Sequence, residues 1–143
     1  MRMRLMENAV ASKLNVLLVD DSRTVLAQLE RILADIPDLA IVGMACDGAA
    51  AIRMANESKP DLVLLDIVMP GLDGLSALRT IKSMHPEIRV AMVTSVSGDA
   101  ARVEEAFRLG ACQVIGKPFE VDSIESLVEA VRRDRAETTV DSD

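Results

Sequence analysis

Aromatic residues and cysteines are scarce in this sequence. It contains no tryptophan, no tyrosine, two phenylalanines and two cysteines among 143 residues. The missing tryptophan and tyrosine exclude a strong intrinsic fluorophore. Cys46 and Cys112 lie in different apolar runs and do not show the spacing of metal ligands. We therefore predict that both are buried, inert thiols, as suits a reducing cytoplasm.

Positive charge and long apolar segments are also limited. The formal net charge of −7 argues against direct binding of nucleic acid, because phosphate backbones attract cations. The basic cluster at 132–135 is interpreted as the solvated last turn of a helix, where cations suit the helix dipole. No apolar stretch approaches the roughly 18 residues that span a bilayer, so membrane insertion is not expected. The first 13 residues lack the apolar core of a signal peptide, which favours a cytoplasmic location.

What the sequence does contain is a regular alternation of strand and helix patterns. Apolar runs predict strands at 14–19, 39–45, 61–66, 88–93 and 112–116. Helical periodicity separates and follows them, at 25–36, 49–58, 74–85, 99–109 and 121–135. This alternation is typical of an α/β fold with a doubly wound parallel sheet and helices on both faces.

Two further expectations concern the limits of the domain and one helix face. We expect the domain to span 14–135, after a flexible lead-in at 1–13 and before an acidic flexible tail at 136–143. In the helix at 99–109, Val103, Ala106 and Phe107 are predicted to face the core.

Polar side chains follow four of the predicted strands, at the point where each strand ends. Asp20 and Asp21 follow the first strand, Asp66 ends the third, Thr94 follows the fourth and Lys117 follows the fifth. The carboxyl ends of the strands in such a sheet meet at one edge, where ligands bind. We therefore expect these five residues to form one site.

Each of these residues also has a simpler interpretation. Asp21 could cap the following helix, Asp66 could be a surface residue, and Thr94 and Lys117 could be turn residues. Adjacent carboxylates are costly near a core unless a cation holds them, however, and Mg²⁺ prefers oxygen ligands. A carboxylate can also accept a phosphoryl group, whose charge a metal ion and a cation must neutralise. The combination predicts a phosphoryl pocket that binds Mg²⁺.

Four short segments carry these residues in a specific combination. They are LLVDDS at 17–22, LLDIVMPGLDG at 64–74, VTS at 93–95 and GKPF at 116–119. With these motifs the chain, from about residue 13 to 133, resembles the receiver domain of bacterial two-component response regulators, of the chemotaxis-regulator type. The resemblance implies a flavodoxin-like (βα)5 three-layer sandwich with the parallel strand order 2-1-3-4-5.

The resemblance also implies a role for each residue of the site. Asp66 matches the phosphoryl acceptor, Lys117 the cation that pairs with the phosphoryl group, and Thr94 the switch hydroxyl that moves toward it.

The same resemblance implies a set of Mg²⁺ ligands. Asp21 and Asp66 match the direct ligands, together with the backbone carbonyl of Val68. Asp20 matches an acid that acts on the metal through water.

Three valines depart from the pattern of many members of this family. Val114 stands three residues before the lysine, where many members carry an aromatic ring that swings inward when the threonine is recruited. Val68 and Val96 occupy positions where many relatives place polar residues near the attacking water. These departures predict an altered switch and slow self-dephosphorylation.

The sequence thus predicts a signalling switch and not an enzyme. A histidine kinase or phosphotransfer protein would phosphorylate Asp66 in the presence of Mg²⁺, and the modification would change binding to a downstream target protein. By resemblance, the readout face is the fourth helix, the fifth strand and the fifth helix, and the protein is a monomer or a phosphorylation-dependent dimer.

Two alternatives remain open at this point. One is a receiver-fold docking or dimerisation module that is not phosphorylated. The other is a Mg²⁺-dependent aspartyl phosphohydrolase, which the absence of a general acid at position 68 and of a cap segment disfavours.

Overall fold

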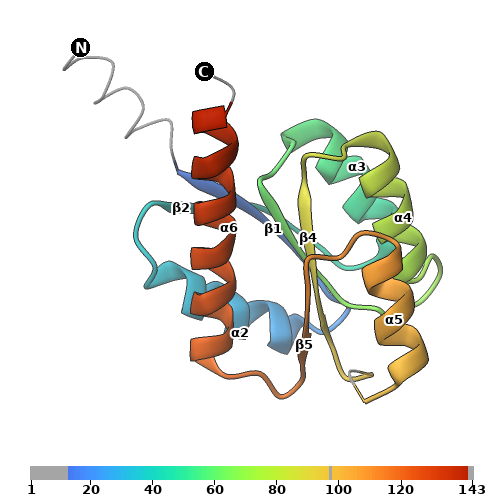
Figure 1. The fold of residues 1–143 in the computed structure, drawn as a ribbon. Helices are drawn as coiled ribbons and strands as arrows, with labels where there is room; N and C mark the ends of the chain where they lie inside the picture. Colours follow the sequence, from blue (N-terminus) through green and yellow to red (C-terminus); the bar gives the residue numbers. More distant parts are fainter. Residues whose placement is uncertain (1–12, 97, 142–143) are drawn as a thin grey trace, which may run out of the picture.

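The protein folds around one parallel sheet flanked by helices. The computed structural model describes residues 13–96 and 98–141, with side chains as far as 136. Within these residues the sheet has the order β2-β1-β3-β4-β5 (Figure 1). Its strands are β1 (Leu14–Val19), β2 (Leu39–Ala45), β3 (Leu62–Leu65), β4 (Arg89–Thr94) and β5 (Gln113–Gly116). The predicted doubly wound fold and its strand order are confirmed.

Helices cover both faces of the sheet. They are α2 (Arg23–Ala34), α3 (Gly48–Ser58), α4 (Gly74–Met84), α5 (Ala100–Arg108) and α6 (Val121–Asp141). Helices α2 and α6 lie on one face, and α3, α4 and α5 lie on the other (Figure 1). The three layers follow from the right-handed connections between parallel strands.

The sheet is buried because its central strands are apolar on both faces. All four residues of β3 are at most 1% exposed. Leu62 and Leu64 contribute to the core beneath α2 and α6, whereas Val63 and Leu65 contribute to the core beneath α3, α4 and α5. A continuous apolar run is the expected pattern for such a strand.

Polar caps fix where four helices begin. The side chains of Ser22, Asp47, Asp73 and Asp99 accept hydrogen bonds from backbone N–H groups in the first turns of α2, α3, α4 and α5. Such caps satisfy N–H groups that have no partner within the helix. Because Ser22 caps α2, Asp21 is not needed for that purpose.

Three side chains are more exposed than we predicted. Cys46 and Cys112 are free and exposed, not buried. They flank β2 and β5, the two edge strands, where a neighbouring strand is present on one side only. Phe107 is 49% exposed, although its spacing placed it on the buried face of α5. Ala106 fills the core position of that turn, and the ring lies outside it.

Helix α6 is longer than predicted and its basic cluster is not its last turn. The helix continues to Asp141, beyond the expected end at Arg135. Arg132 donates a hydrogen bond to the carbonyl of Asp38 at 2.9 Å, and the Arg135 guanidinium lies 3.3 Å from the Asp61 carboxylate. These contacts fasten α6 to the amino-terminal ends of the strands. Apart from Lys13, the predicted lead-in lies outside the described residues.

No helix in the described part of the chain is both long enough and apolar enough to cross a membrane.

Candidate functional site

The residues predicted to form the site meet at the carboxyl edge of the sheet. Asp20 follows β1, Asp66 follows β3, Thr94 ends β4 and Lys117 follows β5. Asp20 is 1% exposed, Asp66 is 4% exposed and Thr94 is fully buried. Asp21 lies beside them at the surface. Each of these polar residues lies at the carboxyl end of a buried strand. Pairing of the strands therefore brings together side chains that are far apart in the sequence.

Lys117 joins two of the carboxylates directly. Its Nζ lies 2.7 Å from Oδ2 of Asp20 and 3.0 Å from Oδ2 of Asp66. Its backbone N–H donates to the carbonyl of Thr94 at 3.0 Å, which holds the start of the loop against β4. The Lys117–Pro118 peptide bond is cis. The backbone hydrogen bond therefore positions Lys117 beside β4, and its side chain reaches both carboxylates from there.

Three carboxylates form a cluster that could hold a metal ion. One oxygen from each of Asp20, Asp21 and Asp66 lies within 4.8 Å of the others. An all-oxygen donor set of this kind suits a hard divalent cation such as Mg²⁺. One lysine cannot balance three carboxylates, so the cluster retains negative charge that a divalent cation would neutralise. The residues present therefore fit the metal ion predicted from the sequence.

Backbone N–H groups orient two of the carboxylates. Oδ1 of Asp20 accepts a hydrogen bond from the N–H of Ser22 at 2.9 Å, and Oδ1 of Asp66 accepts one from the N–H of Val68 at 3.3 Å. In each residue the other oxygen, Oδ2, faces Lys117. Both carboxylates are thus held between a backbone donor and the ammonium group.

The surroundings change the proton affinities of Asp20 and Lys117. Burial raises the pKa of Asp20, and this effect outweighs the hydrogen bonds from Lys117 and Ser22, which lower it. Burial lowers the pKa of Lys117, but its hydrogen bonds to Asp20 and Asp66 prevail and raise it. Lys117 is therefore charged at neutral pH, and the ionised form of Asp20 costs folding free energy.

We expect Asp20→Asn to stabilise the metal-free protein. A raised pKa means that Asp20 contributes stability below the ordinary pKa of an aspartic acid and that this contribution is lost as the pH rises through the raised value. The carboxamide removes the cost at neutral pH and leaves Lys117 paired with Asp66. The gain should be about 1 kcal/mol, or a rise of about 3 °C in Tm.

Thermal unfolding in the presence of a chelator, at neutral and at acidic pH, measures this effect. The gain should disappear at acidic pH, where Asp20 is protonated. Asp21→Asn removes the same charge from an exposed position and should change Tm less. A lower Tm for Asp20→Asn than for the wild type at neutral pH would contradict the expectation.

Thr94 lies on the same edge but its hydroxyl has a local partner. Oγ1 accepts a hydrogen bond from the backbone N–H of Val96 at 3.3 Å. Within the described residues no hydrogen bond joins Thr94 to Asp66. The three valines that depart from the family pattern differ in exposure: Val68 is 47% exposed, whereas Val96 and Val114 pack against the core.

Gly74 is a residue whose importance the sequence did not reveal. A Cβ atom at this position would lie 1.8 Å from the backbone carbonyl oxygen of Asp66. The N–H of Gly74 donates to the carbonyl of Ile67 at 2.7 Å, so α4 begins directly against the end of β3. The Asp73-Gly74 pair marks the helix start in the sequence, but the close approach is a property of the fold.

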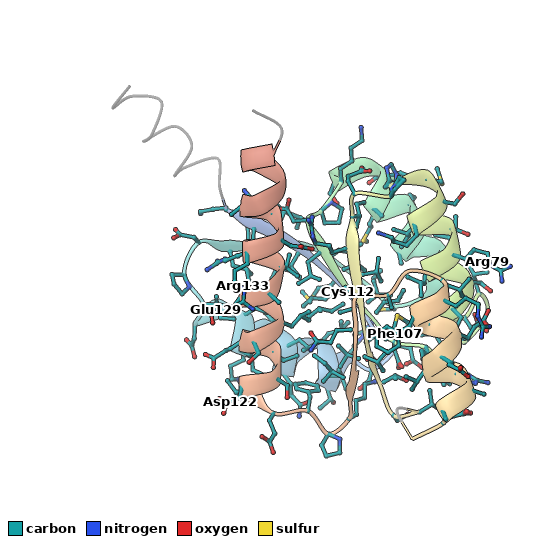
Figure 2. The ribbon with its side chains drawn as sticks, in the orientation of Figure 1. Arg79, Phe107, Cys112, Asp122, Glu129 and Arg133 are labelled. Carbon is teal, nitrogen blue, oxygen red and sulfur yellow. The ribbon has the colours of Figure 1, made fainter. Side chains whose placement is uncertain are left out.

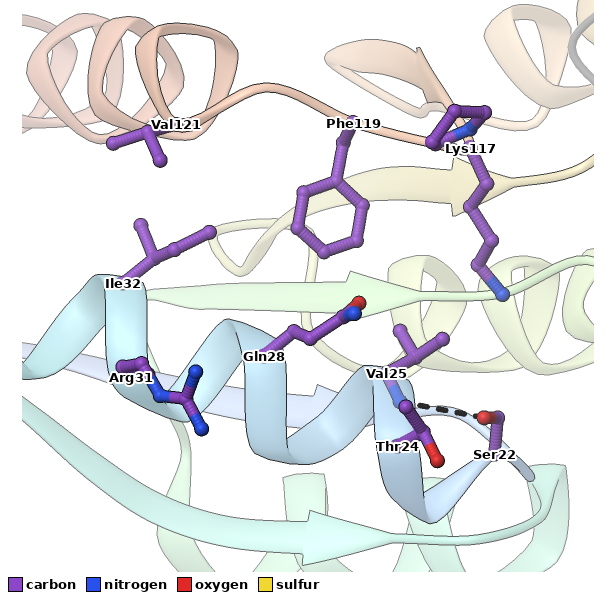
Figure 3. Close-up of a pocket in the computed structure, with 10 residues that line it drawn as sticks. Ser22, Thr24, Val25, Gln28, Arg31, Ile32, Lys117, Phe119 and Val121 are labelled. Carbon is purple, nitrogen blue, oxygen red and sulfur yellow. Dashed lines mark hydrogen bonds between the residues drawn. The ribbon is translucent and has the colours of Figure 1, made fainter.

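A groove opens beside the site, between α2 and the loop that joins β5 to α6. Its volume is about 650 Å³. The Lys117 side chain reaches in from the loop, and the Phe119 ring faces α2 (Figure 3). Ser22, Thr24 and Gln28 supply polar groups on the α2 side. A partner surface in this groove would therefore touch the site through Lys117.

Comparison with known families supports the predicted resemblance. The family model for the response regulator receiver domain matches residues 16–130. A protein-glutamate methylesterase/protein-glutamine glutaminase of Bradyrhizobium diazoefficiens is 40% identical over 122 residues, which are 85% of this chain and 33% of that protein. The response regulator GacA of Pseudomonas viridiflava is 44% identical over 86 residues, 60% of this chain and 40% of that protein. The chain spans about a third of the length of the methylesterase relatives.

Solved structures show the same fold. The response regulator domain of Thermotoga maritima CheB superimposes with a TM-score of 0.75 at 38% identity, covering 84% of this chain and 94% of that one. CheY of Borrelia burgdorferi, in a complex described as CheX-CheY-BeF3-Mg²⁺, is also similar. Its TM-score is 0.77 at 32% identity, and the match covers 82% of this chain and 88% of that one.

Proposed function

Because this chain belongs to the response regulator receiver family, we propose that it is a signalling switch in which Asp66 accepts a phosphoryl group in a Mg²⁺-dependent reaction. The observation that supports this most directly is the position of Lys117, 2.7 Å from Asp20 and 3.0 Å from Asp66. Once a divalent cation balances the carboxylates, the same ammonium group can pair with an oxygen of a phosphoryl group on Asp66.

The proposed reaction assigns a task to each residue. An oxygen of the Asp66 carboxylate attacks the phosphorus of the donor, and the bond from phosphorus to the donor nitrogen or oxygen breaks. Lys117 pairs with a phosphoryl oxygen. Asp21, Asp66 and the backbone carbonyl of Val68 would hold Mg²⁺, with Asp20 acting through water, and the ion would supply positive charge to balance the transferring group.

Thr94 and Lys117 would carry the change to the rest of the protein. The Thr94 hydroxyl exchanges its bond with the Val96 N–H for one with a phosphoryl oxygen, which frees the loop after β4. Binding to a downstream target protein changes because the two arrangements differ in surface. Val114 has no aromatic ring that could change position. The proposed conformational change therefore involves the β4–α5 loop.

The proposed phosphoryl donor is a histidine kinase or a phosphotransfer protein. The groove between α2 and the β5–α6 loop supports this proposal, because it is largely apolar and includes Lys117. A partner helix seated there would bring its phosphorylated side chain beside Asp66. The methylesterase activity named for the relatives is not proposed for these residues, which match only about a third of those proteins.

Incubation with acetyl phosphate tests the proposed function. We expect intact-mass spectrometry to detect one added phosphoryl group per chain with Mg²⁺ present, and none when a chelator removes divalent metal ions. Addition that does not depend on Mg²⁺ would contradict the proposed metal site. No addition under either condition would instead favour a docking or dimerisation module.

We also expect the acyl phosphate to persist. By resemblance to the family, Val68 and Val96 occupy the positions beside the attacking water, and their apolar side chains cannot orient it by hydrogen bonds. Decay should be followed by mass spectrometry after rapid removal of the donor. A lifetime of minutes or longer agrees with this expectation, and a lifetime of seconds would reject it.

A further inference from the structure

Another pocket opens at the carboxyl edge of the sheet, beside the cluster of carboxylates. Its volume is about 710 Å³. The segments that follow β1, β2 and β3 line it, and these three strands are neighbours in the sheet. Asp21 is one of the lining residues and also belongs to the carboxylate cluster. This cavity, here called the Asp21 pocket, therefore adjoins the proposed metal site.

Close packing holds two of the segments that line the Asp21 pocket. A Cβ atom at Gly48, the first residue of α3, would lie 2.5 Å from the backbone carbonyl oxygen of Leu72. The start of α3 therefore lies directly against the loop between β3 and α4. Asp47 caps α3 by accepting a hydrogen bond from the N–H of Ala50 at 2.8 Å. The Asp47 carboxylate is thus already engaged within the protein.

Among the described residues that line the Asp21 pocket, Arg23 is the only cation. It is the first residue of α2 and is exposed. Within residues 13–96 and 98–136, its side chain forms no ion pair or hydrogen bond. Lys117, by contrast, is bonded to two carboxylates. The Arg23 guanidinium is therefore available to a ligand in the pocket.

The charges around the site show what such a ligand would need. The three carboxylates of the cluster are negative when ionised, and Lys117 with one bound divalent ion would balance them. A phosphoryl donor brings further negative charge, and the whole chain has a net charge of −7. Neither the balanced site nor the rest of the protein would then attract an anion by its net charge. Arg23 supplies positive charge at this point.

The position of Arg23 is unfavourable for the helix that carries it. The amino-terminal end of a helix has a partial positive charge, so a cation in the first turn is disfavoured. The first turn of α2 contains no acidic residue that would compensate Arg23. The charge therefore does not serve to stabilise α2, which favours a role in binding.

From these observations we propose that the Asp21 pocket is a binding site for small anionic phosphoryl donors, in which Arg23 pairs with the negative charge of the donor. The site rests on the function proposed above, because the donor that it binds is the one that modifies Asp66. The Asp66 carboxylate attacks phosphorus, the bond from phosphorus to the acyl oxygen breaks, and the carboxylate product leaves with the bonding electrons. The charge of Arg23 also repels a divalent cation, so it favours the donor at the expense of metal affinity.

The first test compares phosphoryl uptake by the wild type and Arg23→Gln at saturating Mg²⁺. Acetyl phosphate carries two negative charges at neutral pH, and phosphoramidate carries one. We expect the rate at low acetyl phosphate to fall about fivefold in the variant, and the rate with phosphoramidate to fall about twofold. The loss should shrink at high ionic strength, because salt screens exposed charges. No loss, an equal loss with both donors, or a loss that salt does not change would overturn the proposal.

The second test measures Mg²⁺ binding without any donor, by isothermal titration calorimetry. Removal of the Arg23 charge should tighten Mg²⁺ binding about threefold, because the guanidinium no longer repels the ion. A disturbed site would bind the ion more weakly, so the sign of the change separates a charge effect from a structural one. Weaker or unchanged binding of Mg²⁺ by Arg23→Gln would overturn the proposal.

Arg133→Gln is a matched control for both tests. Arg133 is also exposed, and in the part of the chain with described side chains it forms no ion pair or hydrogen bond. It lies about three turns from the start of α6, which Asp122 marks in Figure 2. Removal of its charge should leave uptake and Mg²⁺ binding close to those of the wild type. An effect as large as that of Arg23→Gln would mean that net charge alone is responsible, and would overturn the proposal.

The two proposals about this site can fail separately. Uptake by the wild type tests the proposed function, and the comparison with Arg23→Gln tests the donor site. Uptake by the wild type together with an unchanged rate in the variant would overturn the donor site alone. Absence of uptake in the wild type would overturn both. The variant should fold at least as well as the wild type, because glutamine removes the unfavourable charge at the start of α2.

Discussion

The Asp66→Asn variant is expected to take up no phosphoryl group from acetyl phosphate, under conditions in which the wild type is fully modified. An amide cannot act as the nucleophile that forms the acyl phosphate, whereas the carboxylate of Asp66 can. The substitution changes one atom, and Lys117 keeps Asp20 as a partner whichever donor the remaining amide oxygen of residue 66 accepts from. The expected effect is therefore a loss of chemistry and not of structure.

A matched control is available in the same loop. Asp73 caps α4 by accepting a hydrogen bond from the N–H of Ser76 at 2.9 Å. Asparagine is an equally good cap, so Asp73→Asn should leave both stability and phosphoryl uptake close to those of the wild type. Intact-mass spectrometry compares the three proteins after identical incubation. Uptake by Asp66→Asn at the wild-type level would show that another residue is the acceptor.

Gly74→Ala should be strongly destabilising and should also disturb the site. The added Cβ would lie 1.8 Å from the carbonyl oxygen of Asp66, and a backbone atom cannot move aside as a flexible side chain can. Either α4 or the end of β3 must shift, which should cost about 3 kcal/mol. Because the displaced atom belongs to Asp66, phosphoryl uptake should slow even in molecules that remain folded.

Urea unfolding measures the change in free energy, and Gly98→Ala serves as the control. A Cβ at Gly98 would meet no atom within 4 Å. Its free energy of unfolding should therefore stay within about 0.5 kcal/mol of the wild type. If Gly74→Ala unfolds at the same urea concentration as Gly98→Ala, the close approach of α4 to β3 is not tight in solution.

Local patterns were sufficient to predict the order of the elements and to single out polar residues that meet at the carboxyl edge of the sheet. Each strand is a short apolar run and each helix has an apolar stripe, because burial of one face selects for that spacing. Polar residues at the strand ends are conspicuous beside such runs, which is why Asp66 and Lys117 could be singled out. Their roles in phosphoryl transfer remain proposals.

Exposure at the borders of the fold could not be predicted in the same way. The spacing of Phe107 matches a buried helical face, yet the ring is 49% exposed because Ala106 occupies the core position of that turn. Cys112 follows an apolar pattern but precedes an edge strand. A hydrophobic pattern indicates which residues can be buried, and the neighbouring elements determine whether they are.

The order of strands and helices, and the kinds of functional groups at the strand ends, follow from the sequence, because they depend on residues that are neighbours along the chain. Other features depend on contacts between distant segments. They include the two carboxylates that Lys117 bonds, the bond between Thr94 and Val96, the position of Gly74 against Asp66, and the pocket that Asp21 shares with Arg23. Packing of the helices against the sheet sets these distances, and no local pattern encodes them.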